Sequence, residues 1–456
     1  MCELCSMNAK LQGIQGDILR LSVPAVVSNI TIPLLGLCDT AISGHLGAAA
    51  YLGAIAVGAM MLNVTFWLFG FLRMGTSGLA ANAFGAGDSA EQMRVLARAV
   101  LAGFSIGLFI ILVQRPLESL LMAAIAPTED VRSLATRYFR VCIWGSPALL
   151  STMAVSGWFV GMQSTSWPMA VAILTNVVNI VLSLTFSFGM GLGFSGVAYG
   201  TLASNWLGLV LSVVAVAVFM KGRMAFPSLR DVLRGREMMR FFTVNRDLFF
   251  RSACIMAISL AVTRVSAGYG AVLLGANAVM MQFFHMFSFF MDGYAFTAEA
   301  LVGRYCGSRD RGMLSLSVWS LLVWTLSLTA AFTLLYGLGW RPIARLLTDV
   351  GDVVEALGPL SVFIILIPVV SSWAFLLDGF YVGVTKTGRM LFATALSAVV
   401  FFGTAFVDIH DGGLVITSPE LSRLWIAFLS YLLVRGVALG LLWPDTLRRI
   451  FDEPKK

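Results

Sequence analysis

Twelve long apolar runs follow one another along nearly the whole chain, and they restrict the possible folds more than any other feature. They span residues 17–42, 52–84, 92–114, 132–160, 168–188, 194–220, 246–270, 274–305, 314–338, 356–383, 389–409 and 420–445. Each is long enough for a helix that crosses the roughly 30 Å hydrocarbon core of a bilayer. Only 12% of the 456 residues are charged, against roughly 25% in soluble domains. The sequence therefore predicts an all-α polytopic membrane protein with twelve transmembrane helices.

The placement of the basic residues predicts how the chain is oriented in the membrane. With a cytoplasmic N-terminus, 21 of the 31 Lys and Arg residues lie at inner ends, seven at outer ends and three inside spans. Because Lys and Arg concentrate on the cytoplasmic side of membrane proteins, both termini are expected in the cytoplasm. The net charge of +7 is explained by this orientation, so we expect no nucleic-acid partner.

The two halves of the chain resemble each other at one fixed offset. Residues 53–88 aligned without gaps to 275–310 share seven identities, and residues 157–165 match 379–387 at two Gly, one Val and one Thr. Shared apolar composition is the alternative explanation. The repeat predicts two six-helix lobes, residues 1–220 and 246–456, joined by a basic cytoplasmic linker at 221–245. Parallel repeats of this kind favour rocking of two lobes around a central cavity.

Asp39 is a candidate functional residue because it lies in an apolar run. Between Ile18 and Ile42 the only charged residues are Arg20 and Asp39, and Pro24 and Pro33 interrupt the same expected helix. An ionisable residue in lipid is costly and usually functional. Asp39 lies about 28 Å beyond Arg20 at 1.5 Å per residue, so an interfacial carboxylate in contact with water is the alternative.

Uncharged polar side chains form stripes on two further runs. They share one helical face in each run, and they are Asn176, Asn179 and Ser183 on the fifth, and Thr201, Ser204 and Asn205 on the sixth. Such groups can hydrogen-bond a buried carboxyl. Since burial without a paired cation favours the protonated form, Asp39 could bind and release a proton. Helix-to-helix hydrogen bonding is the alternative role of these stripes.

The second half carries its own charged and polar set. His285, Asp292 and Glu299 recur every seven residues, and Asp378 lies on a later run with polar neighbours. Two cations, Arg264 and Arg435, also lie inside spans of this half. A static salt-bridge network, for example Arg264 with Asp292 or Glu299, is the alternative to a cation or proton site.

Sequence motifs for other functions are missing. The chain contains no G-x-x-x-x-G-K-[ST], H-E-x-x-H or G-x-S-x-G motif, which argues against ATP hydrolysis and against common hydrolytic enzymes. Cys2 and Cys5 form a single C-x-x-C pair, a weak metal signal on its own. We therefore expect no catalytic residue, metal or cofactor, and an ion gradient as the energy source.

Several stretches resemble the MATE (multidrug and toxic compound extrusion) family of transporters. "LSVPAVVSNITIPLLGLCDTAISGHLG" (21–47) is similar to the first helix of that family, and "TNVVNIVLS" (175–183) and "YGTLAS" (199–204) to its fifth and sixth. "FLRMGTSGLAANAFGAGD" (71–88) and "MDGYAFTAEALVGRYCG" (291–307) resemble its DinF-like branch, and "LLDGFYVGVTKTGRM" (376–390) its tenth helix. The resemblance covers almost the whole chain.

This resemblance implies a twelve-helix antiporter that exchanges protons or sodium for organic cations and other amphipathic compounds. By the same resemblance, Asp39 is the coupling carboxylate and Pro24 the bending point of the first helix. Asn179 and Thr201 match polar partners of the carboxylate, with Asn176 and Asn205 nearby.

Two departures from the family pattern favour protons over sodium. Many members carry an Asp where this chain has Ser183, and a sodium site prefers several oxygen ligands. Asp378 matches an acid of sodium-coupled relatives, but Arg264 is the only charged residue between Ser252 and Gly270. The acid that those relatives carry on their seventh helix is therefore missing.

The combined prediction is a multidrug/proton antiporter of the bacterial inner membrane. It would act as a monomer on small amphipathic substrates, surrounded by membrane lipids. A sodium-coupled antiporter and a flippase or exporter of lipid-like molecules are the alternatives, and the flippase should show a basic cavity. An intramembrane enzyme would require a catalytic constellation that the sequence lacks.

Overall fold

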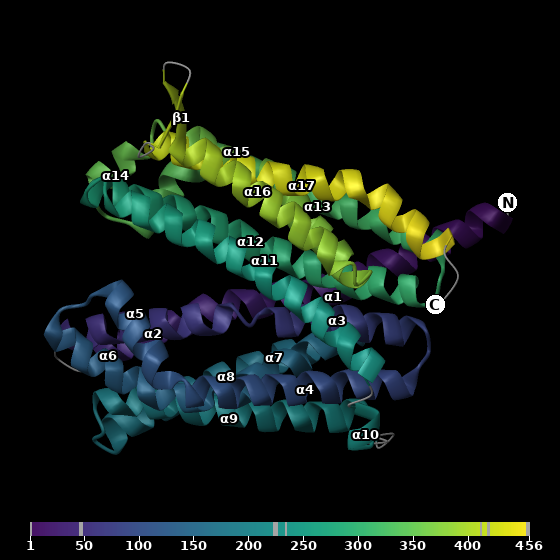
Figure 1. Cartoon of the computed structure of the whole chain (residues 1–456), viewed down its shortest axis with the longest axis horizontal. Helices are drawn as coiled ribbons and strands as arrows, with labels where there is room; N and C mark the ends of the chain where they lie inside the picture. The colour runs from purple at the N-terminus through teal and green to yellow at the C-terminus, as the bar shows by residue number, and fades with distance from the viewer. Residues whose placement is uncertain are drawn as a thin grey trace. The chain divides into compact units, whose positions relative to one another are not determined.

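A computed structural model describes residues 2–44, 49–221, 227–232, 235–410, 413–416 and 420–452 (Figure 1). Parts of the predicted linker, 222–226 and 233–234, and the last residues of the predicted second lobe, 453–456, lie outside the described residues. The predicted helical membrane fold is confirmed. Ten described helices are long and apolar enough to cross a membrane, and they coincide with ten of the twelve predicted runs. The other two runs lie on α1 and on the segment from α6 to α7.

The chain divides into two compact units, which we call the N-terminal unit (Val23–Asn245) and the C-terminal unit (Met1–Ser22 with Arg246–Lys456). The N-terminal half of the chain forms α1 (Cys2–Gly44), α2 (Ala49–Trp67), α3 (Phe71–Gly85), α4 (Ser89–Leu112), α5 (Gln114–Ile125), α6 (Glu129–Cys142), the 3-10 turn η1 (Ile143–Gly145), α7 (Ser146–Gly161), α8 (Ser166–Leu184), the π-helix η2 (Thr185–Gly189), α9 (Phe194–Phe219) and α10 (Leu229–Val232).

The remaining elements belong mainly to the C-terminal unit. They are α11 (Gly235–Ala267), α12 (Ala271–Gly307), α13 (Arg311–Leu347), α14 (Gly351–Ala356), α15 (Ser361–Gly383), α16 (Thr387–Phe406), the strands β1 (Val407–His410) and β2 (Gly413–Ile416), and α17 (Leu421–Asp452). The two strands pair antiparallel, with Val407 opposite Ile416. This short hairpin is an addition to the predicted all-helical architecture.

Two helices contribute residues to both units. α1 leaves the C-terminal unit after Ser22, and α11 leaves the N-terminal unit after Asn245. The predicted boundaries instead assigned residues 1–22 to the first lobe and 221–245 to a separate linker. The first part of α1 is tied to its unit by polar contacts, since Asp17 pairs with Arg304 at 3.5 Å and Gln15 accepts a hydrogen bond from the Trp324 indole.

Glycines at equivalent positions of the repeat allow equivalent close helix contacts. A Cβ atom built on Gly157 of α7 would lie 2.1 Å from the Arg73 carbonyl oxygen of α3. A Cβ built on Gly379 of α15 would lie 2.5 Å from the Ala295 carbonyl oxygen of α12. Real Cβ atoms do not approach backbone so closely, so only glycine fits. The sequence offset of the predicted repeat is thus reproduced in the helix packing.

Helix starts repeat in the same way. The Asp88 carboxylate accepts a hydrogen bond from the Glu91 amide at 2.9 Å at the start of α4, and Asp310 accepts one from the Met313 amide at 2.9 Å at the start of α13. Such N-caps satisfy amides that the first helical turn leaves unpaired. The matched Asp residues of the alignment therefore have one structural role.

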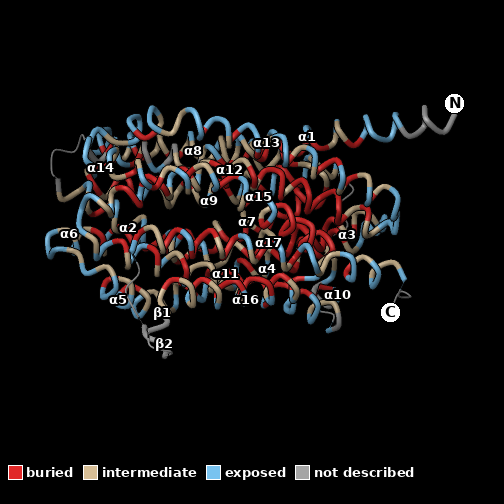
Figure 2. Tube along the Cα trace, turned by 90° about the horizontal axis from the view of Figure 1, so that it is seen from above, coloured by how far each residue is buried: buried red, intermediate tan, exposed pale blue. Residues whose placement is uncertain are grey.

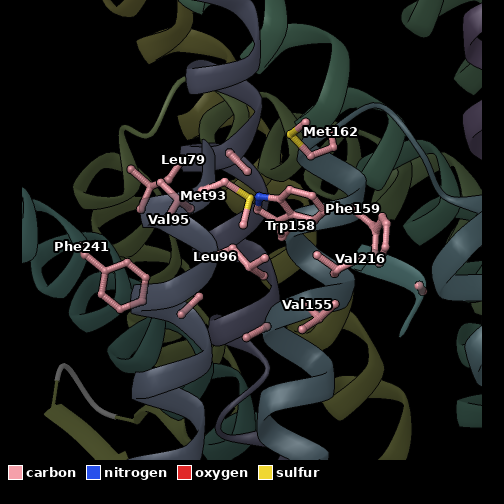
Figure 3. Close-up of a cluster of buried hydrophobic side chains, with 14 of the residues drawn as sticks. Leu79, Met93, Val95, Leu96, Val155, Trp158, Phe159, Met162, Val216 and Phe241 are labelled. Atoms are coloured by element: carbon pink, nitrogen blue, oxygen red, sulfur yellow. The ribbon is translucent and has the colours of Figure 1, made fainter. Parts of the chain in front are cut away.

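A hydrophobic core lies toward the start of α4 in the N-terminal unit (Figure 3). The Trp158 ring packs edge-on against Phe159 and Phe219, and its indole N–H donates to the Gln92 carbonyl at 2.8 Å. Elsewhere, exposed and buried positions alternate along most helices (Figure 2). Many exposed positions carry large apolar side chains, such as Leu112 at 79% and Leu338 at 87% exposure, as expected of helices that face lipid.

Candidate functional site

Asp39 is buried in the N-terminal unit, with only 9% of its surface exposed. It lies near the C-terminal end of α1, five residues before Gly44. The side chains of Tyr138 and Cys142 on α6 lie within electrostatic range of its carboxylate. The carboxylate therefore has a hydroxyl and a thiol among its neighbours.

Tyr138 connects the surroundings of Asp39 to the polar stripe on α9. Its hydroxyl shares side-chain hydrogen bonds with Thr201 and with Cys142. Its ring lies 6.2 Å from that of Phe194, and a Cβ on Gly58 of α2 would lie 2.5 Å from the ring. The glycine thus leaves room for the tyrosine, which fixes the hydroxyl between α1 and α9.

Asn179 of α8 and Thr201 of α9 are hydrogen-bonded to each other, which is the helix-to-helix bonding given above as the alternative role of the two stripes. The Asn179 amide nitrogen donates to the Ser204 hydroxyl at 2.9 Å and to the Thr201 hydroxyl at 3.4 Å. The Ser183 hydroxyl lies 3.5 Å from the Asn179 amide oxygen. A continuous polar group, which we call the N-terminal polar cluster, therefore joins Tyr138, Thr201, Asn179, Ser204 and Ser183.

The two flanking asparagines contact other elements. The Asn176 amide lies 3.5 Å from the Thr31 carbonyl oxygen of α1, so α8 touches the backbone of the helix that carries Asp39. The Asn205 side chain packs on η1, where a Cβ on Gly145 would lie 2.8 Å from its amide nitrogen. Asn176 therefore contacts α1, whereas Asn205 packs where α6 meets α7.

α1 is one continuous helix although Pro24 and Pro33 lie inside it. Each proline lacks the amide hydrogen that would bond the carbonyl four residues earlier, which weakens the helix locally. Pro24 is the second residue after α1 passes from one unit to the other. Between the two prolines, the Thr31 hydroxyl donates to the Ser28 carbonyl at 2.7 Å.

The C-terminal unit holds a different kind of charge cluster around Asp378 of α15. One oxygen of its carboxylate, Oδ2, accepts hydrogen bonds from Arg435 of α17 at 2.6 Å and from Arg251 of α11. Arg435 also donates to the Tyr431 hydroxyl at 2.6 Å. All four residues are nearly enclosed, and Asp378 is only 3% exposed. We call these four residues the Arg–Asp cluster.

The other candidates of this half are dispersed. Arg264 is exposed on α11, and the His285 ring stacks on Phe289 on α12. Asp292 is half-buried, while Glu299 is 1% exposed. The cations that bind Asp378 are therefore Arg251 and Arg435.

The MatE family model matches this chain twice, at residues 24–185 and 248–407. The chain belongs to the MatE family. The "DNA damage-inducible protein F" of Escherichia coli (strain K12) is 31% identical over 428 residues, 93% of this chain and 91% of that protein. A "Probable multidrug resistance protein NorM" of Thermotoga maritima is 25% identical over 316 residues, 65% of this chain and 64% of that protein.

A crystal structure described as "MATE in the bent conformation" has the same fold. Its TM-score is 0.82 at 21% identity, over 97% of both chains. The predicted family and its DinF-like character are confirmed by these similarities. The two matches of the family model also confirm the internal repeat. This MATE protein is therefore a multi-pass membrane transporter of small molecules rather than an enzyme.

Sequence reasoning missed three residues of these two clusters. Tyr138 and Tyr431 carry no charge and lie in aromatic-rich runs, where a ring is indistinguishable from ordinary core. Arg251 follows the basic linker closely and resembles a topology signal. Helical periodicity around Asp39 and Asp378 would not have found these three residues either. Periodicity relates positions on one helix, and each of the three lies on a different helix from its carboxylate.

Proposed function

We propose that this MATE protein exports amphipathic organic cations and other toxic compounds in exchange for protons, by alternating access. The observation that carries the proposal is the burial of Asp39 beside Tyr138, which is hydrogen-bonded into the N-terminal polar cluster. A buried carboxylate is costly when ionised and is stabilised either by a proton or by a bound cation. One site can therefore bind proton and substrate in alternation.

The proposed step begins with Asp39 ionised and an organic cation in the N-terminal unit. Protonation of Asp39 removes the negative charge that holds the cation and converts the carboxylate into a hydrogen-bond donor. Tyr138, Thr201 and Asn179 can then exchange partners, because hydroxyl and amide groups both donate and accept. Transport follows if proton and substrate favour different conformations, since each shifts the equilibrium by its differential affinity.

α1 is the element proposed to transmit this change. It carries Asp39, and it passes from one unit to the other just before Pro24. A proline inside a helix permits a kink at low cost. A bend at Pro24 would move Asp39 and the Thr31 carbonyl relative to α8. We therefore propose Pro24 as the hinge of the coupling step.

The Arg–Asp cluster supports protons rather than sodium as the coupling ion. The Asp378 carboxylate already accepts charge-assisted hydrogen bonds from two arginines, and a sodium ion would have to displace them. Asp378 is thus better suited to hold α11, α15 and α17 together than to bind and release an ion.

We place the transporter in the bacterial inner membrane with both termini in the cytoplasm, as a monomer. The support is the excess of Lys and Arg at the ends assigned to the inside, 21 against seven. Protease digestion of inside-out and right-side-out vesicles tests it, since residues 221–245 should be cleaved only where the cytoplasmic face is outside.

Proteoliposomes loaded with a fluorescent lipophilic cation test the coupling. Wild type and Asp39→Asn are compared under a pH gradient alone and under a sodium gradient alone, with Asp349→Asn as a control because Asp349 is exposed outside the spans. We expect pH-driven efflux in wild type and in the control, and none in Asp39→Asn. Efflux driven by sodium, or unchanged in Asp39→Asn, would refute the proposal. Stimulated exchange of a lipid-linked pyrophosphate, without cation efflux, would favour the flippase alternative.

A further inference from the structure

α11 passes from the N-terminal unit to the C-terminal unit between Asn245 and Arg246. It is one continuous helix there, so the passage lies inside a helix and not in a loop. α1 passes between the units in the same way after Ser22, two residues before Pro24. At the sequence offset of the repeat, Arg246 takes the position of Pro24. The two passages are therefore equivalent, but α11 has no proline at this point.

The residues on either side of the passage are anchored in different units. Asn245 is 5% exposed and packs on α3 of the N-terminal unit, where a Cβ built on Gly75 would lie 2.5 Å from its amide oxygen. Asp247 is 6% exposed and accepts a hydrogen bond from the Thr387 hydroxyl at 3.1 Å, at the start of α16 in the C-terminal unit. Because each unit holds one anchor, a movement of one unit against the other has to be taken up by α11 near Arg246.

The side chain of Asn245 weakens the helix at this point. Its amide nitrogen donates to the Phe241 carbonyl at 2.8 Å, one turn earlier in α11. Such a bond from a side chain to the carbonyl four residues earlier competes with the backbone hydrogen bond and often bends a helix. Phe241 itself lies in the hydrophobic core of the N-terminal unit (Figure 3). The turn before Asn245 is therefore fixed, while its connection to the next turn is weakened.

The amide oxygen of Asn245, Oδ1, is buried and has no hydrogen-bond partner among the described residues. A buried acceptor without a partner costs free energy. If α11 opened at Asn245, the amides of residues 245–248 would lose their carbonyl partners. An asparagine that precedes a helix accepts a hydrogen bond from the second or third amide of that helix, which here belong to Asp247 and Leu248. The Asp247 carboxylate would then lie in the first turn, where the helix dipole favours an acidic group.

We propose that Asn245 is a concealed N-cap, a residue that lies inside continuous α11 in this structure and starts a separate helix, 246–267, when the transporter changes conformation. α11 then bends at Asn245 while α1 bends at Pro24, and the units move without release of the Asn245 and Asp247 anchors. The inference rests on the transport proposed above. Asn245 is a positioning residue, since it acts through the helix and not on substrate or proton.

Two variants separate capping from packing. Asn245→Ser keeps a good N-cap on a smaller side chain, whereas Asn245→Ala removes the cap and favours the continuous helix. Thr243→Ala is the control, because the Thr243 hydroxyl makes the same kind of bond, to the Met239 carbonyl at 2.9 Å, on an exposed part of α11. The full-length proteins are compared by pH-driven efflux of a fluorescent cation from proteoliposomes, by amide hydrogen exchange of residues 245–248 and by Tm.

We expect efflux and the hydrogen exchange of residues 245–248 both to slow about fivefold in Asn245→Ala, the factor that corresponds to the typical stabilisation by an N-cap. Both rates should stay within about twofold of wild type in Asn245→Ser and Thr243→Ala, since neither change removes an N-cap. The Tm of Asn245→Ala should not fall, because the variant removes a buried acceptor without a partner.

Equal hydrogen exchange of these amides in wild type and Asn245→Ala would overturn the proposal, and so would unchanged efflux in a folded Asn245→Ala variant. Loss of efflux in Asn245→Ser together with a lower Tm would assign Asn245 to packing on α3 and would overturn it as well. If wild type shows no pH-driven efflux, the proposed function fails, and the exchange of wild type against Asn245→Ala still decides whether Asn245 is an N-cap.

Discussion

Replacement of Asp378 by asparagine tests whether this carboxylate supports the fold or takes part in ion coupling. In the wild type the carboxylate accepts hydrogen bonds from Arg435 and Arg251, and all three side chains are buried. The variant leaves two buried guanidinium groups without their anionic acceptor. Removal of one partner from a buried ion pair costs roughly 3–5 kcal/mol. Since 1 kcal/mol shifts Tm by about 2–4 °C in a protein unit of this size, we expect Tm to fall by about 6–20 °C.

The assay is thermal unfolding of detergent-purified protein, followed by tryptophan fluorescence, with Asp39→Asn and Asp349→Asn measured in parallel. Asp39→Asn replaces a buried ionisable carboxyl by a neutral amide of the same size, and burial disfavours the ionised form, so its Tm should equal or exceed that of wild type. Asp349→Asn should match wild type because the side chain is exposed. The double variant Asp378→Asn with Arg435→Gln should lower Tm by less than the sum of the two single-variant decreases, because the two residues are in contact.

A particular result would refute this reasoning. If Asp378→Asn melts within about 2 °C of wild type and has lost cation efflux, then Asp378 takes part in coupling and the Arg–Asp cluster is not a structural support. If Asp39→Asn is the destabilised variant instead, then the Asp39 carboxylate supports the fold of the N-terminal unit, and its proposed role in proton exchange is wrong.

Further variants test the remaining contacts of the N-terminal unit. Tyr138→Phe keeps the ring but loses the hydroxyl that bonds Thr201 and Cys142. Because such a hydrogen bond is worth roughly 1.4 kcal/mol, pH-driven efflux should slow about tenfold. Unchanged efflux kinetics would show that the hydroxyl has no role in coupling. Gly157→Ala should prevent stable membrane insertion or lower Tm strongly, because its Cβ would lie 2.1 Å from the Arg73 carbonyl oxygen; expression with a wild-type Tm would contradict the close contact. Pro24→Ala should leave Tm unchanged or higher while efflux falls, and full efflux would exclude Pro24 as a hinge.

Features that depend on neighbouring residues along one helix could be predicted from the sequence. The apolar runs gave the helices because a bilayer permits few other structures. The spacing of Asn176, Asn179 and Ser183 predicted that their side chains share one face of a helix, because helical periodicity places positions i, i+3 and i+7 on the same side. The single basic-rich interruption near the middle of the chain also indicated where the two repeats meet.

Features that depend on the packing of different helices could not be predicted. Nothing in the local sequence indicates that Tyr138 lies beside Asp39, since they are on α6 and α1. Likewise, the sequence suggested Arg264 as a partner of acids, whereas the structure brings Arg251 and Arg435 to Asp378. Arg251 is near a charged linker, so its local context masks its role. The predicted span at residues 132–160 is likewise divided into α6, η1 and α7, and the sequence did not predict this division.

The repeat preserves packing but not chemistry, and this difference explains how one fold can hold two unlike clusters. Gly157 and Gly379 are equivalent and make equivalent contacts, yet the residue before Gly379 is Asp378 and the residue before Gly157 is Ser156. Close helix packing depends on backbone and glycine, so it withstands exchange of the neighbouring side chain. A carboxylate at the position of Asp378 can therefore be present in one unit and absent from the other without loss of the fold. On this basis the proposed coupling residues of the N-terminal unit should not be sought at equivalent positions of the C-terminal unit.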